Sequence, residues 1–216
     1  MIKNIIGIII LFVFTSSCSN EVKNEDIGYL EINGINIVNG DFKTKALNEG
    51  EDFEISIYNE DNEIVKAYKS YLEILNNNDV IRLFEGNYYI VARSKDIPIS
   101  GIKCPTYKGI SDIFSIERGK TSDVSLMCKL DGIAIKFYVS KEIEEVFSDF
   151  EILITPISGD NIIIKKENID DIIYLIIENQ TFYYTINATN IEGESFTIKK
   201  KVDVEEAHKY EIEINL

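Results

Sequence analysis

The sequence contains no tryptophan and a single histidine, His208. Histidine is the side chain whose ordinary pKa lies nearest neutrality, so one histidine leaves little material for acid–base or nucleophilic catalysis. His208 lies in a charged stretch just before the last predicted strand, where we expect it to be solvated. No Gly-x-Ser-x-Gly elbow is present, and neighbouring carboxylates arise freely among so many acidic residues. The sequence therefore predicts a non-enzymatic protein with no catalytic residue and no cofactor.

Positive charge and cysteine are also scarce. Lys and Arg number 22 against 37 Asp and Glu, which gives a net charge of −15. Such a chain repels nucleic acid, whose binding depends on neutralising phosphates, so we exclude a nucleic-acid partner. The three cysteines have no metal-type spacing, and we expect no metal site. In an exported protein Cys104 and Cys128 could form a disulfide, but Cys128 could equally be a small buried apolar residue.

The chain lacks an apolar run long enough to cross a bilayer. The longest, Ile5–Phe14, has about ten residues where a spanning helix needs about 20. It follows Lys3 and precedes Thr15-Ser16-Ser17-Cys18, the pattern of a secretory signal that ends at a cysteine. We expect residues 1–17 to be a lipoprotein signal peptide, Cys18 to be lipidated, and the acidic segment 18–26 to be a tether. The membrane partner is then reached through the lipid on Cys18, with an outer-membrane, surface location.

Alternation of apolar and polar residues is the dominant pattern after the tether. It is clearest at Phe53–Ile57, Ile133–Val139 and Tyr210–Leu216. Successive side chains of a strand point to opposite faces, so each run predicts a strand with one buried face. Many short strands separated by turn residues such as Ser158-Gly159 favour a β-sandwich.

One segment has helical spacing instead. In Lys141–Phe150 the apolar residues Ile143, Val146, Phe147 and Phe150 recur at i, i+3, i+4 and i+7, with Ser140 as a possible N-cap. The sequence therefore predicts one short helix over these residues. A second helix, or an irregular excursion, is possible over Tyr68–Asn77.

The second half of the chain repeats features of the first in the same order. Asp52-Phe-Glu-Ile55 recurs as Asp149-Phe-Glu-Ile152, and the aromatic run Tyr88–Ala92 recurs as Tyr183–Ala188. An offset of about 100 residues matches the size of one small domain. We expect one β-sandwich over 27–130, a second over 131–216, and a stiff rod because the junction is short.

A set of motifs in the first half resembles a known family. The motifs are Asp52-Phe53, Ile57-Tyr58-Asn59, Ile81-Arg-Leu83, Gly86-Asn-Tyr88, Pro105-x-Tyr107-x-Gly109, Phe114-x-Ile116, Gly119-Lys120-Thr121 and Cys128-Lys129-Leu130. In that order they resemble the DUF4493 family of Bacteroidetes lipoproteins, relatives of the fimbrillin and Mfa-like adhesins. The resemblance covers nearly all of the chain after the tether, most specifically 52–130. It implies an all-β fold of two tandem transthyretin-like or Ig-like sandwiches and no catalytic residues.

The same resemblance implies binding or adhesion, with other fimbrial subunits as possible partners. In fimbrillin-type adhesins, subunits join by adding a strand to a neighbour's sheet edge, and proteolysis after a basic residue can open that edge. Lys43 and Lys45 lie where such processing would occur, although an ordinary basic loop explains them too. The alternative is a glycan-binding lipoprotein of a polysaccharide-uptake system. Its sugars would stack on tyrosines that face outward, and the candidates are Tyr71, Tyr89, Tyr107, Tyr138, Tyr174 and Tyr183.

Overall fold

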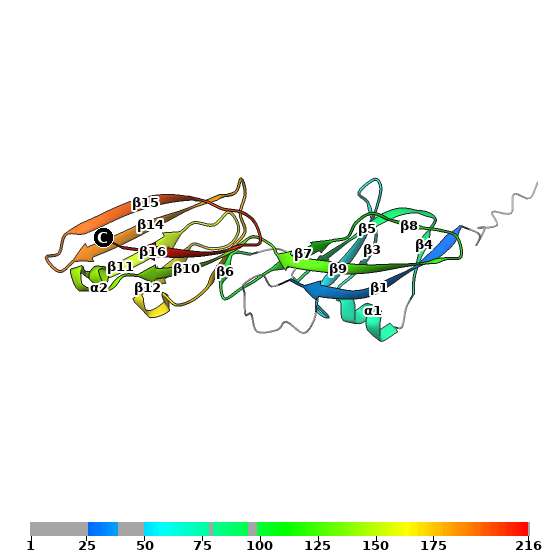
Figure 1. Cartoon of the computed structure of the whole chain (residues 1–216), viewed down its shortest axis with the longest axis horizontal. Coiled ribbons are helices and arrows are strands. Elements are labelled where there is room, and N and C mark those ends of the chain that lie inside the picture. Colours follow the sequence, from blue (N-terminus) through cyan, green and yellow to red (C-terminus); the bar gives the residue numbers. More distant parts are fainter. Residues whose placement is uncertain (1–25, 39–49, 78–79, 95–98, 216) are drawn as a thin grey trace, which may run out of the picture.

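The computed structural model describes residues 26–38, 50–77, 80–94 and 99–215. They form two β-sandwiches that lie end to end along the long axis of the molecule, as Figure 1 shows. The all-β fold predicted from alternation is confirmed.

The first sandwich is formed by a single sheet that curls round its own core. Its strand order is β3-β2-β5-β7-β9-β1-β4, and β8 pairs with β5. The strands are β1 (Ile27–Ile37), β2 (Glu54–Asn59), β3 (Ile64–Tyr68), β4 (Ile81–Phe84), β5 (Gly86–Arg93), β7 (Tyr107–Ile110), β8 (Phe114–Ile116) and β9 (Thr121–Leu130). Helix α1 (Tyr71–Asn77) connects β3 to β4 and lies within the region where a second helix was possible. The structure therefore contains one helix more than the single helix predicted.

The second sandwich consists of two separate four-stranded sheets, with orders β16-β10-β13-β6 and β12-β11-β14-β15. Its own strands are β10 (Ile133–Val139), β11 (Phe147–Ile154), β12 (Ile162–Lys165), β13 (Ile173–Leu175), β14 (Thr181–Asn190), β15 (Ser195–Asp203) and β16 (Lys209–Ile214). A 3-10 turn, η1 (Lys166–Asn168), connects β12 to β13.

The predicted helix is shorter than expected. Helix α2 spans Lys141–Val146, and the chain is already in strand β11 from Phe147. Helical spacing continued to Phe150, but from Phe147 onward the backbone pairs with β14, beginning with Phe147 opposite Asn190. A ladder of that length supplies more hydrogen bonds than one further helical turn. Ser140 is the N-cap residue, as predicted, although its side chain makes no capping hydrogen bond.

The two sandwiches share one topology. In each, the first strand pairs in parallel with the last, β1 with β9 and β10 with β16. The first copy of the Asp-Phe-Glu-Ile motif overlaps the start of β2 and the second lies within β11, and these strands pair antiparallel with β5 and β14. Ile55 and Ile57 face one core, and Ile152 and Ile154 face the other, all of them at most 1% exposed. The repeat seen in the sequence is therefore a repeat of strand pairing.

Each sandwich has a cluster of buried apolar side chains, and the first cluster also includes Ala134 and Tyr174 from β10 and β13 of the second sandwich. Alternation explains both: in β9, Val124, Leu126, Cys128 and Leu130 are buried while the residues between them are exposed. Burial of such side chains contributes about 1.5–3 kcal/mol each, the main favourable term in folding.

A short strap from the first half of the chain crosses to the second sandwich. Strand β6 (Gly101–Ile102) pairs with β13, although it lies within the 27–130 range predicted for the first domain. The buried Ser100 hydroxyl accepts the Ile176 N–H at 3.0 Å, and the Lys103 N–H donates to the Ile172 carbonyl at 2.9 Å. Hydrogen bonds from the strap thus join the bodies, in addition to the covalent link through the two residues between β9 and β10. A boundary near Leu130-Asp131-Gly132 remains a prediction.

Candidate functional site

The two sheets of the second sandwich are not joined at one side. β15 is the last strand of one sheet and β16 is the last strand of the other, and they are not paired with each other in the described residues. In the first sandwich the corresponding side is closed, because β7 pairs with β9 through Tyr107 opposite Leu130. The repeat therefore has one closed copy and one open copy.

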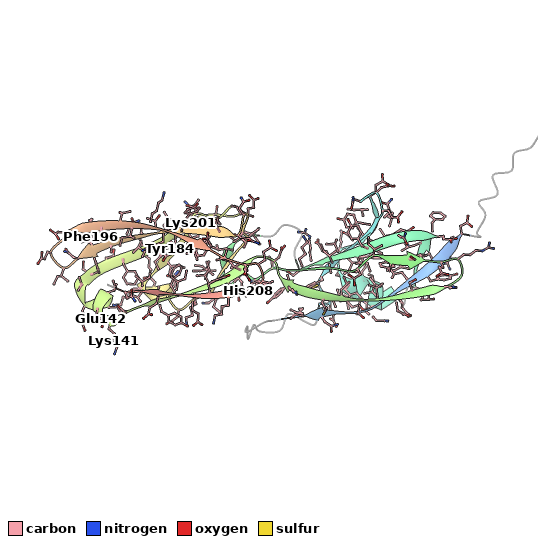
Figure 2. The ribbon with its side chains drawn as sticks, turned by 45° about the horizontal axis from the view of Figure 1, so that its top comes forward. Lys141, Glu142, Tyr184, Phe196, Lys201 and His208 are labelled. Atoms are coloured by element: carbon pink, nitrogen blue, oxygen red, sulfur yellow. The ribbon has the colours of Figure 1, made fainter. Side chains whose placement is uncertain are left out.

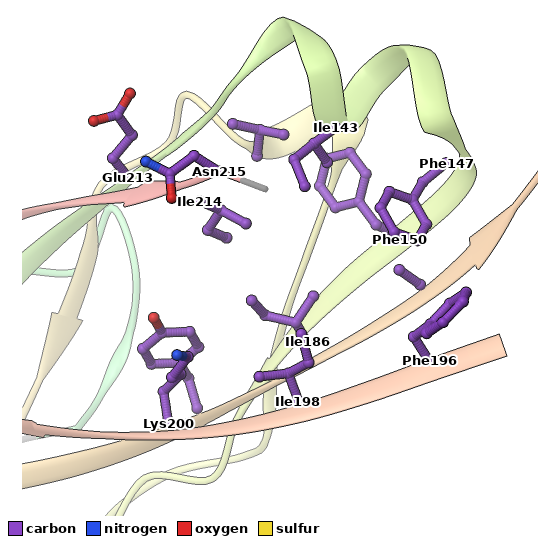
Figure 3. Close-up of a pocket in the computed structure, with 13 residues that line it drawn as sticks. Ile143, Phe147, Phe150, Ile186, Phe196, Ile198, Lys200, Glu213, Ile214 and Asn215 are labelled. Carbon is purple, nitrogen blue, oxygen red and sulfur yellow. The ribbon is translucent and has the colours of Figure 1, made fainter.

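An apolar groove with a volume of about 460 Å3 lies at the open side. Figure 3 shows α2 and β16 on one side of it and β15 on the other. The residues that line it are Val139, Ile143, Phe147, Phe150, Tyr184, Ile186, Ala188, Phe196, Ile198, Lys200, Glu213, Ile214 and Asn215.

The register of β15 determines which of its side chains enter the groove. Phe196 lies opposite Ala188 and Ile198 lies opposite Ile186, so both point to the inner side of the sheet. They are nevertheless 43% and 49% exposed, because no strand covers them there in the described part of the chain. Phe196 is held edge-on against Phe147, with ring centroids 5.7 Å apart. The groove thus presents half-buried apolar side chains on an ordered strand.

The backbone at this side also has unused hydrogen-bonding capacity. β15 pairs with β14 along one edge only, and β16 pairs with β10 along one edge only. A strand edge of this kind is a template for an added strand. Apolar side chains between two such edges are the arrangement that β-strand addition requires: the backbone supplies affinity and the pockets supply specificity.

The groove has few charged side chains in its lining, which is mostly apolar. Lys200 faces inward at one end, opposite Tyr184, whereas Lys199 and Lys201 face outward. A hydrogen bond to Asp203, with Nζ–Oδ1 at 3.1 Å, raises the pKa of Lys201. Desolvation raises the pKa of Tyr184, which packs edge-on against Phe137 in the core. The lysines on β15 also protect an edge strand from uncontrolled aggregation, so a partner that binds here must tolerate them.

The residues predicted for anchoring and processing, Cys18, Lys43 and Lys45, lie outside the described residues.

The possible disulfide is not formed. Cys128 points into the first core, where a methyl group on Gly109 would lie 2.6 Å from its Sγ, whereas Cys104 follows β6 on the strap. Burial raises the pKa of Cys128 to about 12, so the thiol stays neutral.

His208 does not form a catalytic arrangement. It lies in the turn before β16, near the junction of the sandwiches (Figure 2), with a largely exposed side chain. Its Nδ1 is within hydrogen-bonding distance of the Glu206 carbonyl, at 2.8 Å.

Within the described ranges, no group of three His, Cys, Asp or Glu side chains could hold a metal ion. None of the helices in those ranges is long and apolar enough to cross a bilayer.

The six tyrosines proposed for sugar stacking divide into two groups. Tyr71, Tyr107 and Tyr174 are buried, and the Tyr71 hydroxyl donates to the Ile32 carbonyl at 2.7 Å. Tyr138 and Tyr183 are 40% and 55% exposed. The sixth, Tyr89, is half-buried and stacks on its cross-strand partner Tyr58, with ring centroids 5.0 Å apart. The Lys136 ammonium lies over the Tyr138 ring, 4.9 Å from its centroid, so Tyr183 is the better candidate for stacking.

The fold and the groove together define a class: a tandem β-sandwich protein with an open sheet end and, among its described residues, no catalytic or metal centre. The chain belongs to the DUF4493 family, described as a domain of unknown function, whose model matches residues 26–216. The match spans both sandwiches, whereas the sequence motifs were sharpest in the first. No curated protein matches the chain.

Several solved structures are similar to this one. A fimbrial assembly protein from Parabacteroides distasonis has a TM-score of 0.55 at 9% identity, over 88% of this chain and 90% of that chain. A protein described as a cell adhesion protein from Bacteroides eggerthii has a TM-score of 0.48 at 9% identity, over 88% and 85%. The fimbrial anchor protein Mfa2 from Porphyromonas gingivalis has a TM-score of 0.42 at 8% identity, over 79% and 82%. At these identities the first similarity shows a shared fold.

Proposed function

We propose that this protein is a lipid-anchored, surface-exposed binding protein of the adhesin type, without enzymatic activity. Cys18 holds it on the outer membrane, and the open side of the second sandwich takes an extended segment of a partner protein, such as a fimbrial subunit. One observation carries the proposal: two unpaired strand edges, β15 and β16, flank a groove lined by apolar side chains. The fold shared with a fimbrial assembly protein supports it.

The position of the groove supports the same function. Figure 1 places the start of β1 at one end of the rod and α2, which borders the groove, at the other end. A chain anchored through Cys18 enters the rod at β1, so the groove would lie away from the membrane. The strap keeps the two bodies from folding back on each other. This arrangement suits a protein that presents a binding site outward.

Anchoring and orientation are tested by protease shaving of intact cells that express the wild type or Cys18→Ala. The proposal expects the wild type to fractionate with membranes and to be removed by protease, and Cys18→Ala to leave the membrane fraction. Survival of a membrane-bound wild type would place the protein on the periplasmic side and contradict the surface location.

The groove is tested with Ile198→Asp and the matched control Ile163→Asp. Ile198 is on β15 and Ile163 is on β12, at opposite ends of one sheet, and they are 49% and 45% exposed. A carboxylate in the groove would have to be buried by an incoming strand, which costs several kcal/mol, at least about tenfold in affinity. We expect Ile198→Asp to abolish co-purification of surface-fibre subunits and adhesion of the cells, and Ile163→Asp to retain both. Equal behaviour of the two variants would refute the groove as the contact.

Proteolytic opening at Lys43 or Lys45 remains a prediction. Trypsin nicking followed by size-exclusion chromatography tests it: concentration-dependent polymers support processing, and a nicked monomer argues against it.

A glycan-binding lipoprotein is the second candidate, favoured by the exposed ring of Tyr183. Tyr183→Ala should then abolish binding on a glycan array, with the buried-ring variant Tyr71→Phe as a control that keeps the outer surface unchanged. If the wild type binds no glycan on the array, this candidate falls and the adhesin proposal is unaffected.

A further inference from the structure

The first sandwich has a different kind of opening, between the two ends of its curled sheet. β3 is one end of the strand order and β4 is the other. Two hollows, of about 640 and 330 Å3, lie between them. The larger is lined mainly by polar and aromatic side chains, including Tyr29, Lys66, Tyr68, Arg82 and Thr121. The smaller is lined mainly by apolar side chains.

Lys66 and Arg82 border both hollows, so two cations converge on one opening. They reach it from opposite sides. Lys66 lies opposite the core residue Ile57 and points inward, whereas Arg82 lies opposite Tyr29 and points outward. Neither forms an ion pair within the described part of the chain, although the protein carries 37 acidic residues.

Protection of an edge strand explains only part of this arrangement. An inward-pointing lysine at a sheet edge prevents edge-to-edge pairing, which accounts for Lys66 on β3. It does not account for Arg82, which faces outward on a different strand and borders the same hollows. Lys66 is also partly buried, and no carboxylate among the described residues forms an ion pair with it, which would lower the cost of its partial burial. The pair is suited to receive an anion.

The surroundings of the two cations restrict the kind of anion. Tyr29 lies between Arg82 and Thr121 in the sheet register, so a guanidinium, an aromatic ring and a hydroxyl follow one another on the outer face. Aromatic rings beside hydroxyl groups suit a sugar ring, whose C–H face packs on the ring while its hydroxyls bond to polar side chains. The next outward pair along these strands, Glu31 opposite Asp123, is acidic. These two carboxylates repel the negative charge of a ligand, so the ligand's anionic group is expected on the Lys66–Arg82 side.

We propose that the opening between β3 and β4 binds a carboxylated sugar, a uronic acid or a related acidic residue of a polysaccharide. Its carboxylate lies between Lys66 and Arg82, and its ring lies toward Tyr29 and Thr121. The inward charge of Lys66 lies at the middle of β3 and disfavours an apolar strand here, whereas in the groove of the second sandwich the inward lysine, Lys200, lies at one end. The two sites lie in different bodies, so this proposal stands or falls independently of strand capture.

The probe is a galacturonic acid trisaccharide titrated into the whole chain without its signal peptide, with the methyl ester of the same trisaccharide as the neutral comparison. The free acid should bind and the ester should bind at least about tenfold more weakly, since a hydrogen bond to a charged group is worth about that factor. Lys66→Gln and Arg82→Gln should each weaken binding of the acid by a similar factor. Lys129→Gln, an exposed cation on β9 that borders neither hollow, should leave it unchanged. Added salt should weaken binding of the acid and not of the ester.

Three outcomes overturn the proposal. Equal binding of the acid and its ester would show that charge is not recognised. An acidic peptide that binds as well as the trisaccharide would assign the site to proteins and not to sugars. Absence of binding, together with self-association of Lys66→Gln on ultracentrifugation, would show that the cations only protect the sheet edge. Thermal unfolding of each variant confirms that loss of binding is not loss of fold.

Discussion

Replacing Gly132 with alanine should destabilise the junction of the two sandwiches strongly. Gly132 has φ +117, a region that residues with a Cβ rarely adopt. A Cβ there would lie 2.1 Å from the Leu175 carbonyl oxygen, well inside contact distance. Backbone, not a flexible side chain, occupies that space, so either β10 or β13 must move.

The size of the effect follows from three contributions. Holding a non-glycine residue in this region costs about 1–3 kcal/mol. A shift of β10 from β13 would disturb the pair Ile133 opposite Leu175 and the 2.7 Å bond from the Ala207 N–H to the Gly132 carbonyl. Each lost bond removes about 0.5–1.5 kcal/mol. The total is about 2–6 kcal/mol, a large part of the usual stability of about 5–15 kcal/mol.

Gly119→Ala provides the matched control. Gly119 has φ +69, but no atom lies within 4 Å of the position its Cβ would take. It should cost only the conformational term, about 1–2 kcal/mol. The assay is urea unfolding of both variants followed by far-UV circular dichroism. If Gly132→Ala is no more destabilising than Gly119→Ala, the close approach to Leu175 does not constrain the junction and the reasoning is wrong.

Two further predictions concern the strap and the buried thiol. Ser100→Ala leaves the Ile176 N–H without its acceptor and should lower the free energy of unfolding, measured in urea, by about 1–3 kcal/mol. Lys103→Gln removes a largely exposed ion pair with Asp171 and should lower it by at most about 1 kcal/mol. Similar losses in the two variants would contradict the importance of Ser100. Cys128 should resist alkylation in the folded protein, while the partly exposed Cys104 reacts. The pKa of Cys128 is raised to about 12 from 9.0, so its contribution to stability should be complete below pH 9 and be lost as pH rises toward 12. Cys128→Ala should lack this pH dependence. If the free energy of unfolding falls equally steeply with alkaline pH in Cys128→Ala and the wild type, the prediction is refuted.

Local patterns predicted the strands of this protein well. Alternation identified β2, β10 and β16 because apolar side chains on one face of each alternate with mostly polar ones on the other, although Ala134 on the second face of β10 is also buried. The same patterns misjudged the end of α2, since Phe147 and Phe150 fit helical spacing, whereas β11 has a register shift between Phe147 and Asp149 that interrupts strand alternation. The sequence left the disulfide open for a related reason: nothing in it shows that Cys128 faces a core while Cys104 lies on a strap.

The groove could not be predicted because it is a property of pairing between distant strands. Phe196, Ile198 and Lys200 alternate with polar residues, which predicts a strand but not whether its outer edge has a neighbour. The Lys66–Arg82 opening depends likewise on β3 and β4 being the two ends of one curled sheet. Strap β6 is only two residues long, too short to give any periodicity.

The parallel pairing of β1 with β9 has a mechanical consequence. A pull on the start of β1 is opposed at the far end of β9, where the chain continues into β10. In a parallel pair these two points lie at opposite ends of the ladder, so tension shears all its hydrogen bonds together and cannot open them one at a time. β10 and β16 repeat the arrangement in the second sandwich. A tether attached at one end and a load applied at the other would therefore be carried by whole ladders, as flow across a cell surface would demand.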